Sequence, residues 1–338
     1  MRGHVSHRCA QSREVKGDKM KVLITGGAGF IGSHLSDELI AAGNEVTVLD
    51  NLSTGRFENI AHLEGNKSFQ FIEGDILNEM LVDKLVERCD VVYHLAAAVG
   101  VDLVVKKPLE SLVTNIKGSE IVLNMVHRYH KKILITSTSE IYGKNTNGPL
   151  KEDDDRILGS PLKVRWGYST AKAVDEMLAY IYWKEKKVPA IIVRLFNTVG
   201  PRQTGAYGMV IPRFVGQALN NEDITVYGTG KQSRCFLHVE DVIKTLIKLM
   251  NNKDAVGQVF NIGSQEEITI ENLAKKVIEI TKSKSKIIYI PYDKAYEEGF
   301  EDMQRRVPDT TRVKNLVGFK PTIDLEGTIK SVVEYYRK

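Results

Sequence analysis

Short apolar runs alternate with longer amphipathic segments in the first part of the chain. Several runs are nearly continuous Val, Ile and Leu, which is typical of strands buried on both faces of a parallel sheet. Between the runs, the patterns at 33–42, 109–129 and 168–186 predict helices. The alternation predicts an open, doubly wound α/β sheet with right-handed crossovers. The six runs span residues 21–25, 45–50, 69–72, 90–94, 132–136 and 190–194.

The pattern changes after residue 197. Turn clusters at 200–205 and 227–230 separate shorter elements, and helices are predicted at 239–251, 270–281 and 324–336. We interpret residues 20–197 as a nucleotide-binding domain of the Rossmann type and 198–338 mainly as a smaller, mixed C-terminal lobe. The boundary is approximate, and the chain is allowed to cross between the two.

Composition places the chain among ordinary globular proteins. Of its 338 residues, 42% are hydrophobic and 27% are charged, and no apolar run approaches the roughly 18 residues of a membrane helix. We therefore expect a protein without a membrane partner. Cys9, Cys89 and Cys235 are few and far apart, which predicts neither a metal site nor a disulfide framework and favours the cytoplasm.

The net charge of +4 is spread along the chain, whereas a nucleic-acid binder usually concentrates Lys and Arg on one face. No nucleic-acid partner is therefore expected. Residues 1–19 are polar and basic and lack the apolar core of a secretory signal. We expect a disordered tail, or a start assigned too early with Met20 as the true start. An arm that binds nucleic acid is the alternative.

A glycine-rich segment follows the first apolar run directly. Gly26 permits a tight turn, Gly29 lets the backbone approach a pyrophosphate, and Gly32 lets the next helix pack close to the strand. The free N–H groups and positive dipole end of that helix attract the pyrophosphate. Phe30 and Ile31 belong to the same expected cofactor site, and a plain turn is the alternative.

Asp50 ends the second apolar run, 18 positions after Gly32. A carboxylate there accepts hydrogen bonds from the ribose hydroxyls of NAD and repels the extra phosphate of NADP. NAD is therefore the expected cofactor, although the nearby Arg56 leaves NADP open and Asp50 is alternatively an ordinary acid at a strand end. The further expected cofactor contacts follow the second, third and fourth runs, and they are Asn51, Ser53, Asp75, Ile76, Leu95, Ala96 and Ala97.

Tyr168 and Lys172 are four residues apart, which puts them on one face of a predicted helix. Tyrosine ordinarily has a pKa near 10, and a lysine ammonium and a positive nicotinamide ring both lower that pKa. Tyr168 then acts as a base that removes a hydroxyl proton while hydride leaves the same carbon. Thr138, after the fifth run, is placed to hydrogen-bond the reacting oxygen. The alternative is a surface pair.

With these motifs, the sequence resembles the extended short-chain dehydrogenases/reductases that modify nucleotide sugars. The resemblance covers about residues 20 to 336 and also rests on the segments 194–203, 227–242 and 305–309. It implies tightly held NAD, a UDP-sugar or other nucleoside-diphosphate sugar in the second lobe, and a homodimer.

The resemblance also implies a site for the diphosphate of the sugar nucleotide. Arg234 and Arg306 would clamp its two charges, because guanidinium groups bind phosphate through two donors at once. Asn197 would contribute its side-chain amide. The alternative for each arginine is a surface salt bridge, such as Arg306 with Asp309.

The family's enzymes share oxidation of the sugar at C4, after which 4-epimerases, uronate decarboxylases and 4,6-dehydratases diverge. The triplet Thr138-Ser139-Glu140 is similar to that of UDP-glucuronate decarboxylases and of GDP-mannose 4,6-dehydratases. Ser139 counts against the TDP-glucose dehydratases. Arg165 matches an arginine of the decarboxylases and suits an anionic sugar. Glu140 is alternatively a buried acid that only orients a loop.

Two segments point the other way. Ala98-Val-Gly100 and 107–110 are more similar to galactose epimerases. We expect UDP-glucuronate decarboxylation first, 4-epimerisation of a UDP-sugar second and 4,6-dehydration third. A scaffold protein that binds NAD without turnover is the non-enzyme alternative, against which the intact Thr138, Tyr168 and Lys172 argue.

Overall fold

A computed structural model describes residues 19–98, 107–205, 209–295, 303 and 305–338, so the prediction for the tail falls, apart from Lys19, outside the described residues. The main sheet has seven parallel strands in the order β11-β6-β5-β4-β1-β2-β3. Its strands are β1 (Lys21–Thr25), β2 (Glu45–Asp50), β3 (Phe69–Glu73), β4 (Val91–His94), β5 (Lys132–Thr138), β6 (Ala190–Leu195) and β11 (Val259–Ile262).

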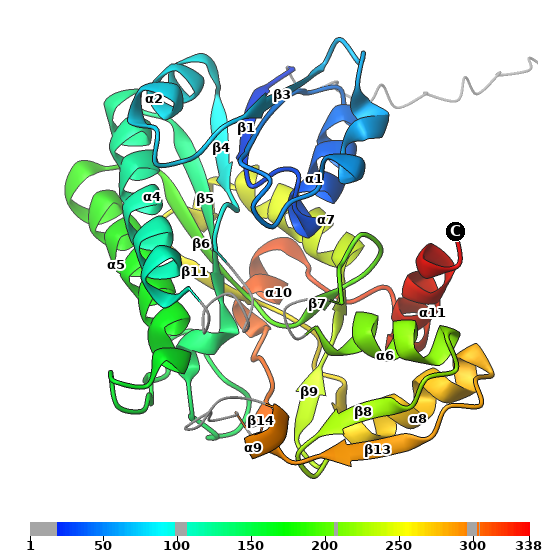
Figure 1. Cartoon of the computed structure of the whole chain (residues 1–338). Coiled ribbons are helices and arrows are strands. Elements are labelled where there is room, and N and C mark those ends of the chain that lie inside the picture. Colours follow the sequence, from blue (N-terminus) through cyan, green and yellow to red (C-terminus); the bar gives the residue numbers. More distant parts are fainter. Residues whose placement is uncertain (1–18, 99–106, 206–208, 296–302, 304) are drawn as a thin grey trace, which may run out of the picture.

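Helices cover both faces of this sheet, as Figure 1 shows. Successive side chains of a strand point to opposite faces, so Leu23 packs into the core beneath α2, α4 and α5, whereas Val22 and Ile24 pack toward α1 and α7. The apolar runs of the inner strands are therefore buried on both sides, as predicted, whereas the residues of the edge strand β3 are only partly buried or exposed. The covering helices are α1 (Phe30–Ala41), α2 (Glu79–Arg88), α4 (Pro108–Arg128), α5 (Gly167–Lys186), α7 (Val239–Met250) and α10 (Thr311–Val317).

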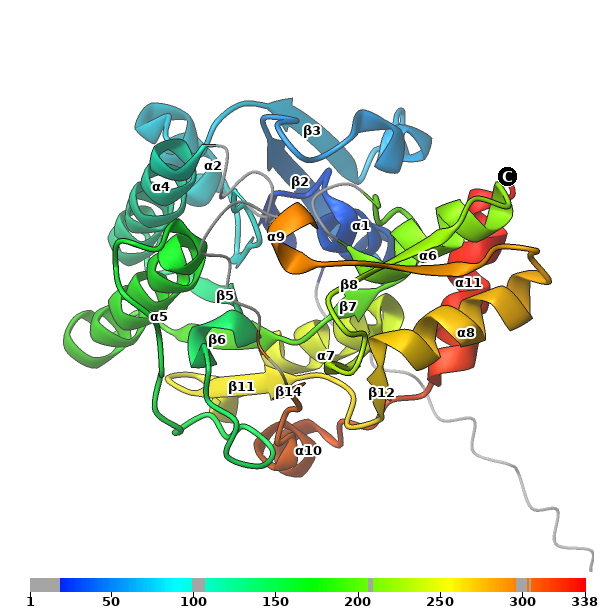
Figure 2. The same ribbon diagram turned by 60° about the horizontal axis from the view of Figure 1, so that its bottom comes forward.

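The later part of the chain builds a smaller region beside the carboxyl ends of the main strands (Figure 2). Helices α6, α8 and α11 share a core of their own with β8. The elements of this region are β7 (Thr198–Val199), α6 (Val210–Leu219), β8 (Ile224–Tyr227), β9 (Ser233–Cys235), β10 (Leu237–His238), β12 (Glu267–Thr269), α8 (Ile270–Thr281), β13 (Ile287–Ile290), α9 (Tyr292–Ala295), β14 (Arg305–Arg306) and α11 (Leu325–Tyr336).

The fold class predicted from the sequence is confirmed, with two differences in element bounds that matter for the site. The first helix starts at Phe30, inside the glycine-rich turn, rather than at residue 33. The fifth strand continues to Thr138, because Ser137 and Thr138 pair with Arg194 and Leu195 of β6. Backbone pairing thus holds two polar residues in strand geometry that their hydropathy does not indicate.

The proposed domain division at residue 197 stays a prediction, but the chain does cross between the two parts. Strand β11, which comes late in the sequence, pairs in parallel with β6 and completes the main sheet. Helix α7, also from the later part, packs against α1. The run Val259–Ile262 is too short and too isolated in the sequence to indicate which sheet it joins.

Candidate active site

A cavity of about 720 Å³ lies at the carboxyl ends of the main strands, between them and the smaller region. Open α/β sheets bind ligands at this edge. Every cofactor, catalytic and substrate residue expected from the sequence lines this one cavity. These residues are Gly26, Gly29, Phe30, Ile31, Gly32, Asp50, Asn51, Ser53, Asp75, Ile76, Leu95, Ala96, Ala97, Thr138, Ser139, Glu140, Arg165, Tyr168, Lys172, Asn197, Arg234 and Arg306.

The glycine-rich turn has no room for side chains. A Cβ at Gly26, whose φ is +73°, would lie 2.7 Å from the backbone nitrogen of Ala96. A Cβ at Gly32 would lie 2.4 Å from the carbonyl oxygen of Gly26, and one at Gly29 would lie 3.2 Å from it. The turn thus presents bare backbone to the cavity where α1 begins, and this cradle fits the pyrophosphate of a dinucleotide.

Asp50 closes the other side of this cradle. One of its carboxylate oxygens, Oδ2, accepts a hydrogen bond of 3.0 Å from the Ala28 N–H, and Oδ1 accepts one of 2.8 Å from the Leu52 N–H. Burial raises the pKa of the Asp50 carboxyl, and these backbone donors oppose that rise. Next to it, the Asn51 amide donates to Asp75 over 2.8 Å. The two backbone hydrogen bonds therefore fix the Asp50 carboxylate at the cavity wall.

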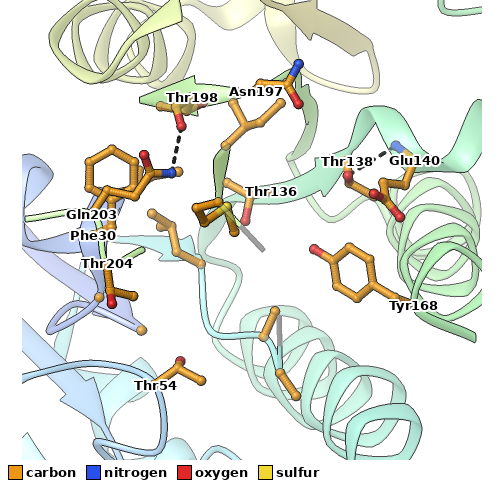
Figure 3. A pocket seen from close by; sticks show the side chains of 18 of the residues that line it. Phe30, Thr54, Thr136, Thr138, Glu140, Tyr168, Asn197, Thr198, Gln203 and Thr204 are labelled. Carbon is orange, nitrogen blue, oxygen red and sulfur yellow. Dashed lines mark hydrogen bonds between the residues drawn. The ribbon is translucent and has the colours of Figure 1, made fainter. Parts of the chain in front are cut away.

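Tyr168 reaches the cavity from the first turn of α5, and its hydroxyl points into the open space near Thr138 and Glu140 (Figure 3). The Thr138 hydroxyl oxygen accepts a hydrogen bond of 3.2 Å from the Glu140 N–H. Thr138 ends its strand, so the hydroxyls of Tyr168 and Thr138 are presented by a helix and a strand rather than by loops.

The pKa of Tyr168 in the protein alone differs from the sequence-based expectation. Burial raises the pKa of this phenol, and the charges of Glu140 and Asp175 raise it further. Burial is the main reason, and a further acid stands near the lysine, because the Lys172 ammonium donates to the Asp175 carboxylate over 2.9 Å. The sequence pattern of Tyr168 and Lys172 gave no indication of this third residue.

Glu140 is bound by two guanidinium groups. Arg165 donates to both of its carboxylate oxygens, over 2.6 and 3.0 Å, and Arg306 approaches one of them at 3.4 Å. Burial favours the neutral acid, but the two arginines outweigh burial and lower the pKa of Glu140 to about 2. Glu140 is therefore a carboxylate at any physiological pH and holds two cations at the cavity wall.

The remaining substrate residues lie where the cavity borders the smaller region. Arg306 also donates to the Asn197 side-chain oxygen over 2.9 Å, and the Asn197 amide donates to the Cys235 carbonyl over 2.8 Å. Arg234 donates to the Ser233 carbonyl over 2.8 Å and, like Arg306, is 8% exposed. The structure thus brings both arginines of the expected diphosphate clamp to one cavity.

Sequence reasoning missed one cation at this end. The guanidinium carbon of Arg213, on α6, lies 3.9 Å from the centroid of the Tyr227 ring, and both residues line the cavity. The Nε and Nη1 atoms of Arg213 are buried and make no hydrogen bond with the residues that the structure describes. No sequence motif marks Arg213. The structure places it on the amphipathic helix α6, next to Phe214.

The described residues offer neither a metal site nor a membrane span. Within the described ranges, no cluster of three or more His, Cys, Asp or Glu side chains is arranged to hold a metal ion. Nor do those ranges contain a helix with the length and apolar character that crossing a bilayer requires.

Known proteins share this architecture and much of the sequence. The family model described as GDP-mannose 4,6 dehydratase matches residues 23–332. A UDP-N-acetyl-alpha-D-glucosaminuronate decarboxylase of Bacillus cytotoxicus is 41% identical over 95% of this chain and 98% of its own length. UDP-glucuronic acid decarboxylase 1 of Danio rerio is 36% identical over 95% of this chain and 73% of its own length.

A solved structure is also similar over nearly its whole length. UDP-glucuronic acid 4-epimerase of Bacillus cereus, in complex with UDP-glucuronic acid and NAD, superposes with a TM-score of 0.85 at 30% identity. The match covers 94% of this chain and 99% of that one.

Proposed function

This chain belongs to the GDP-mannose 4,6-dehydratase family, within the extended short-chain dehydrogenases/reductases that modify nucleotide sugars, and we propose that it decarboxylates a UDP-linked uronic acid. It is an NAD-dependent enzyme of the decarboxylase and epimerase group. The proposal concerns which of these reactions takes place and which residues carry it.

The observation that carries the proposal is the charge around Glu140. Two guanidiniums, Arg165 and Arg306, converge on a single carboxylate at the cavity wall beside Thr138. That wall keeps one positive charge in excess, inside a site where charges are poorly screened. An anionic sugar is attracted there, whereas a neutral hexose has no group to match it.

The ionised state of Glu140 also bears on the choice of reaction. A 4,6-dehydratase needs an acid that donates a proton to the departing hydroxyl at C6. With its pKa lowered to about 2 by Arg165 and Arg306 against the effect of burial, Glu140 does not hold such a proton near neutral pH. Glu140 is therefore not the acid of such a step, although its carboxylate suits a base for the C5 proton, so the choice of decarboxylation rests on the excess positive charge of the wall.

The residues divide the chemistry as follows. Tyr168 takes the proton of the C4 hydroxyl, and Thr138 hydrogen-bonds the same oxygen. NAD, held at the glycine-rich turn and Asp50, would supply the acceptor and donor of the C4 hydride when bound. The C4 ketone is then β to the carboxylate on C5. The C5–carboxylate bond breaks, carbon dioxide leaves, and the bond's electron pair passes to the C4 oxygen as an enolate. Donors from Tyr168 and Thr138 stabilise that charge until C5 is protonated.

The UDP-sugar site is proposed where the cavity borders the smaller region, with Arg306 lying between this site and Glu140. Arg234 and Arg306 supply the diphosphate contacts, and Asn197 orients Arg306 through their 2.9 Å hydrogen bond. Arg165 is expected from the sequence to contact the sugar. Instead, both of its terminal nitrogens donate hydrogen bonds to the Glu140 carboxylate. We therefore assign Arg165 a positioning role, in which it fixes Glu140.

The second candidate is 4-epimerisation of a UDP-uronate, favoured by the similarity to the UDP-glucuronic acid 4-epimerase of Bacillus cereus. Both reactions start with the same C4 ketone. They differ in whether the C5–carboxylate bond is held out of the plane of that ketone, where it breaks, or in the plane, where it survives.

Product analysis by NMR separates the candidates. The NAD-loaded enzyme is incubated in parallel with UDP-glucuronate, UDP-N-acetylglucosaminuronate, UDP-glucose and GDP-mannose. Loss of the uronate carboxyl, with release of carbon dioxide, is expected with one or both uronates. The Tyr168→Phe variant serves as the control, which should bind NAD and lose at least about 100-fold in turnover. A uronate product that keeps its carboxyl supports the epimerase, and no product from any sugar supports a scaffold protein.

A homodimer is the proposed assembly. Helices α4 and α5 pack side by side, and their outer faces carry large exposed apolar side chains at helical spacing. Patches of this kind mark interaction surfaces, and a second copy of the same paired helices presents a matching face. These side chains, named here the α4–α5 patch, are Leu109, Val113, Met177, Tyr180 and Ile181.

A further inference from the structure

A carboxylate lies directly behind the lysine of the proposed active site. Asp175 follows Lys172 by three residues on α5, and its Oδ2 accepts a hydrogen bond of 2.9 Å from the lysine Nζ. The two side chains are 0% and 2% exposed. An ion pair this deeply buried is rarely a gain in stability over apolar side chains of the same size, because both charges lose their hydration.

The contacts of Asp175 point away from a purely structural role. Its second oxygen, Oδ1, is buried and has no hydrogen-bond partner among the described residues. A buried acceptor left unsatisfied destabilises the fold. By contrast the next acid on the helix, Glu176, is bound by the Arg194 guanidinium through three hydrogen bonds. The lysine ammonium is thus the only group that Asp175 engages within the described structure.

We propose that Asp175 is a positioning residue for the couple of Tyr168 and Lys172, which fixes the ammonium from behind and makes the couple hold its proton more tightly. The proposal rests on the proposed role of Tyr168 as the base, but not on which sugar is the substrate. An ammonium has three donors. With one of them directed at Asp175, the other two are set toward groups bound in the cavity.

The electrostatic surroundings of Tyr168 fit this role. Burial raises the pKa of the phenol most, and the negative charges of Glu140 and Asp175 add to the rise. Glu140 is already neutralised by Arg165 and Arg306. Asp175 is therefore the acid whose charge is balanced only by the catalytic lysine itself.

The other charged groups on the elements around α5 occur mostly in pairs. From α4, Lys107 and Glu110 line the cavity and bind each other over 3.0 Å. From β6, Arg194 is bound to Glu176. From β4, His94 is buried and neutral near Lys172, since burial and then that lysine lower its pKa to about 3. The cavity-facing end of β5 contributes only uncharged side chains.

The sign of the effect follows from treating Tyr168 and Lys172 as one titrating couple. The couple must lose one proton before it can accept one from the substrate. A negative charge at Asp175 opposes that loss, whichever of the two residues gives up the proton. Removing the charge makes the loss easier and moves it to lower pH.

The test compares Asp175→Asn with Glu176→Gln, a neighbouring buried acid on the same helix. The ionisation of Tyr168 is followed in NAD-loaded enzyme by tyrosinate absorbance, as the difference from the same protein carrying Tyr168→Phe. The rising limb of the pH–kcat profile is recorded in parallel. We expect Asp175→Asn to move both transitions to lower pH by about one unit or more. Glu176→Gln, although it removes a buried ion pair, should leave both in place.

A transition that stays where it is in Asp175→Asn, or that moves to higher pH, overturns the proposal. If Asp175→Asn does not give folded protein, Asp175→Ser provides a second neutral side chain of smaller size and is subject to the same criterion. Tyrosinate absorbance needs no sugar. A failure of the proposed decarboxylation therefore leaves this result interpretable, and a failure of the absorbance shift leaves the decarboxylation assay untouched.

Discussion

At the scale of single residues, two short motifs contribute to the cavity wall. Gly26, Gly29 and Gly32 are recognisable because their spacing is a requirement of backbone geometry, and Tyr168 and Lys172 because four residues make one helical turn. Each such motif is local in the sequence, so it can be recognised without knowledge of the tertiary structure. The roles of these residues stay predictions until the variants above are measured.

The residues that sequence reasoning missed are those whose partners come from elsewhere in the chain. Arg213 depends on its contact with Tyr227 across two elements. Asp175 is close to Lys172 in sequence, yet nothing in the pattern shows that it points inward and is fully buried. Glu140 and Arg165 were both singled out, but their mutual binding was not, because it joins positions 25 residues apart.

The position of Arg213 leads to a prediction about nucleotide affinity. Arg213→Met keeps the length and the apolar contact with Tyr227 but removes a buried cation from the cavity. We expect the Kd for UDP, measured by calorimetry, to rise roughly tenfold, which corresponds to about 1.4 kcal/mol.

The matched control for this prediction is Arg312→Met. Arg312 binds Asp153 over 2.6 Å and does not line the cavity, so this variant should keep the affinity for UDP. Equal losses in the two variants would show that Arg213 contributes only general positive charge.

At the scale of elements, hydropathy located the first six strands of the main sheet but gave no strand order. The six predicted runs are all strands of one sheet, and five of them are mostly buried, while the run at 69–72 forms the partly exposed edge strand β3. Helix α2 and strand β11 were not predicted. The position of β11 beside β6 depends on the folded shape of everything between them, which no local pattern encodes.

A buried histidine links β4 to β1 and α4 and makes the folding stability of the protein depend on pH. His94, at the end of β4, is hydrogen-bonded to the Thr25 hydroxyl at 2.7 Å and to Ser119 of α4 at 3.1 Å. Burial and the charge of Lys172 lower its pKa to about 3. Below about pH 6.5, His94 therefore binds a proton in the unfolded chain but stays neutral in the folded protein.

We expect this histidine to cost about 1.4 kcal/mol of folding stability per pH unit as the pH falls below about 6.5. His94→Gln keeps hydrogen-bonding groups but cannot take up the proton. Urea unfolding at pH 7 and pH 5 should show a smaller loss of stability on acidification in the variant than in the unmodified protein. Parallel losses in the two proteins would contradict the assignment.

At the scale of the whole molecule, the site exists only because two parts of the chain meet. The main sheet contributes the glycine-rich turn, Thr138 and Tyr168, and the smaller region contributes Arg213 and Arg234. Family resemblance predicted this division of labour, and hydropathy alone indicated only that the pattern changes near residue 197.

The α4–α5 patch gives a prediction about assembly. Charges introduced by the double change Met177→Glu and Tyr180→Glu would be buried without partners in a dimer that uses this face, which is strongly unfavourable. Sedimentation should therefore show a dimer for the unmodified protein and a monomer for the double variant.

Tyr289→Glu provides the control for assembly. Tyr289 is an equally large exposed ring, but it lies on β13 in the smaller region, away from α5 (Figure 1). This variant should stay dimeric. A dimer that persists in the double variant would exclude the α4–α5 patch as the interface.

The pairing of β11 with β6 has a consequence for how the molecule is made. When the chain has been synthesised up to residue 195, the β6 edge of the main sheet has no neighbouring strand. Strand β11, which pairs with this edge, is complete only at residue 262. Until then the nascent chain exposes a template on which another strand can add. Completion of the main sheet must therefore wait until much of the smaller region has been made, so the two parts are not consecutive, separable stretches of the chain.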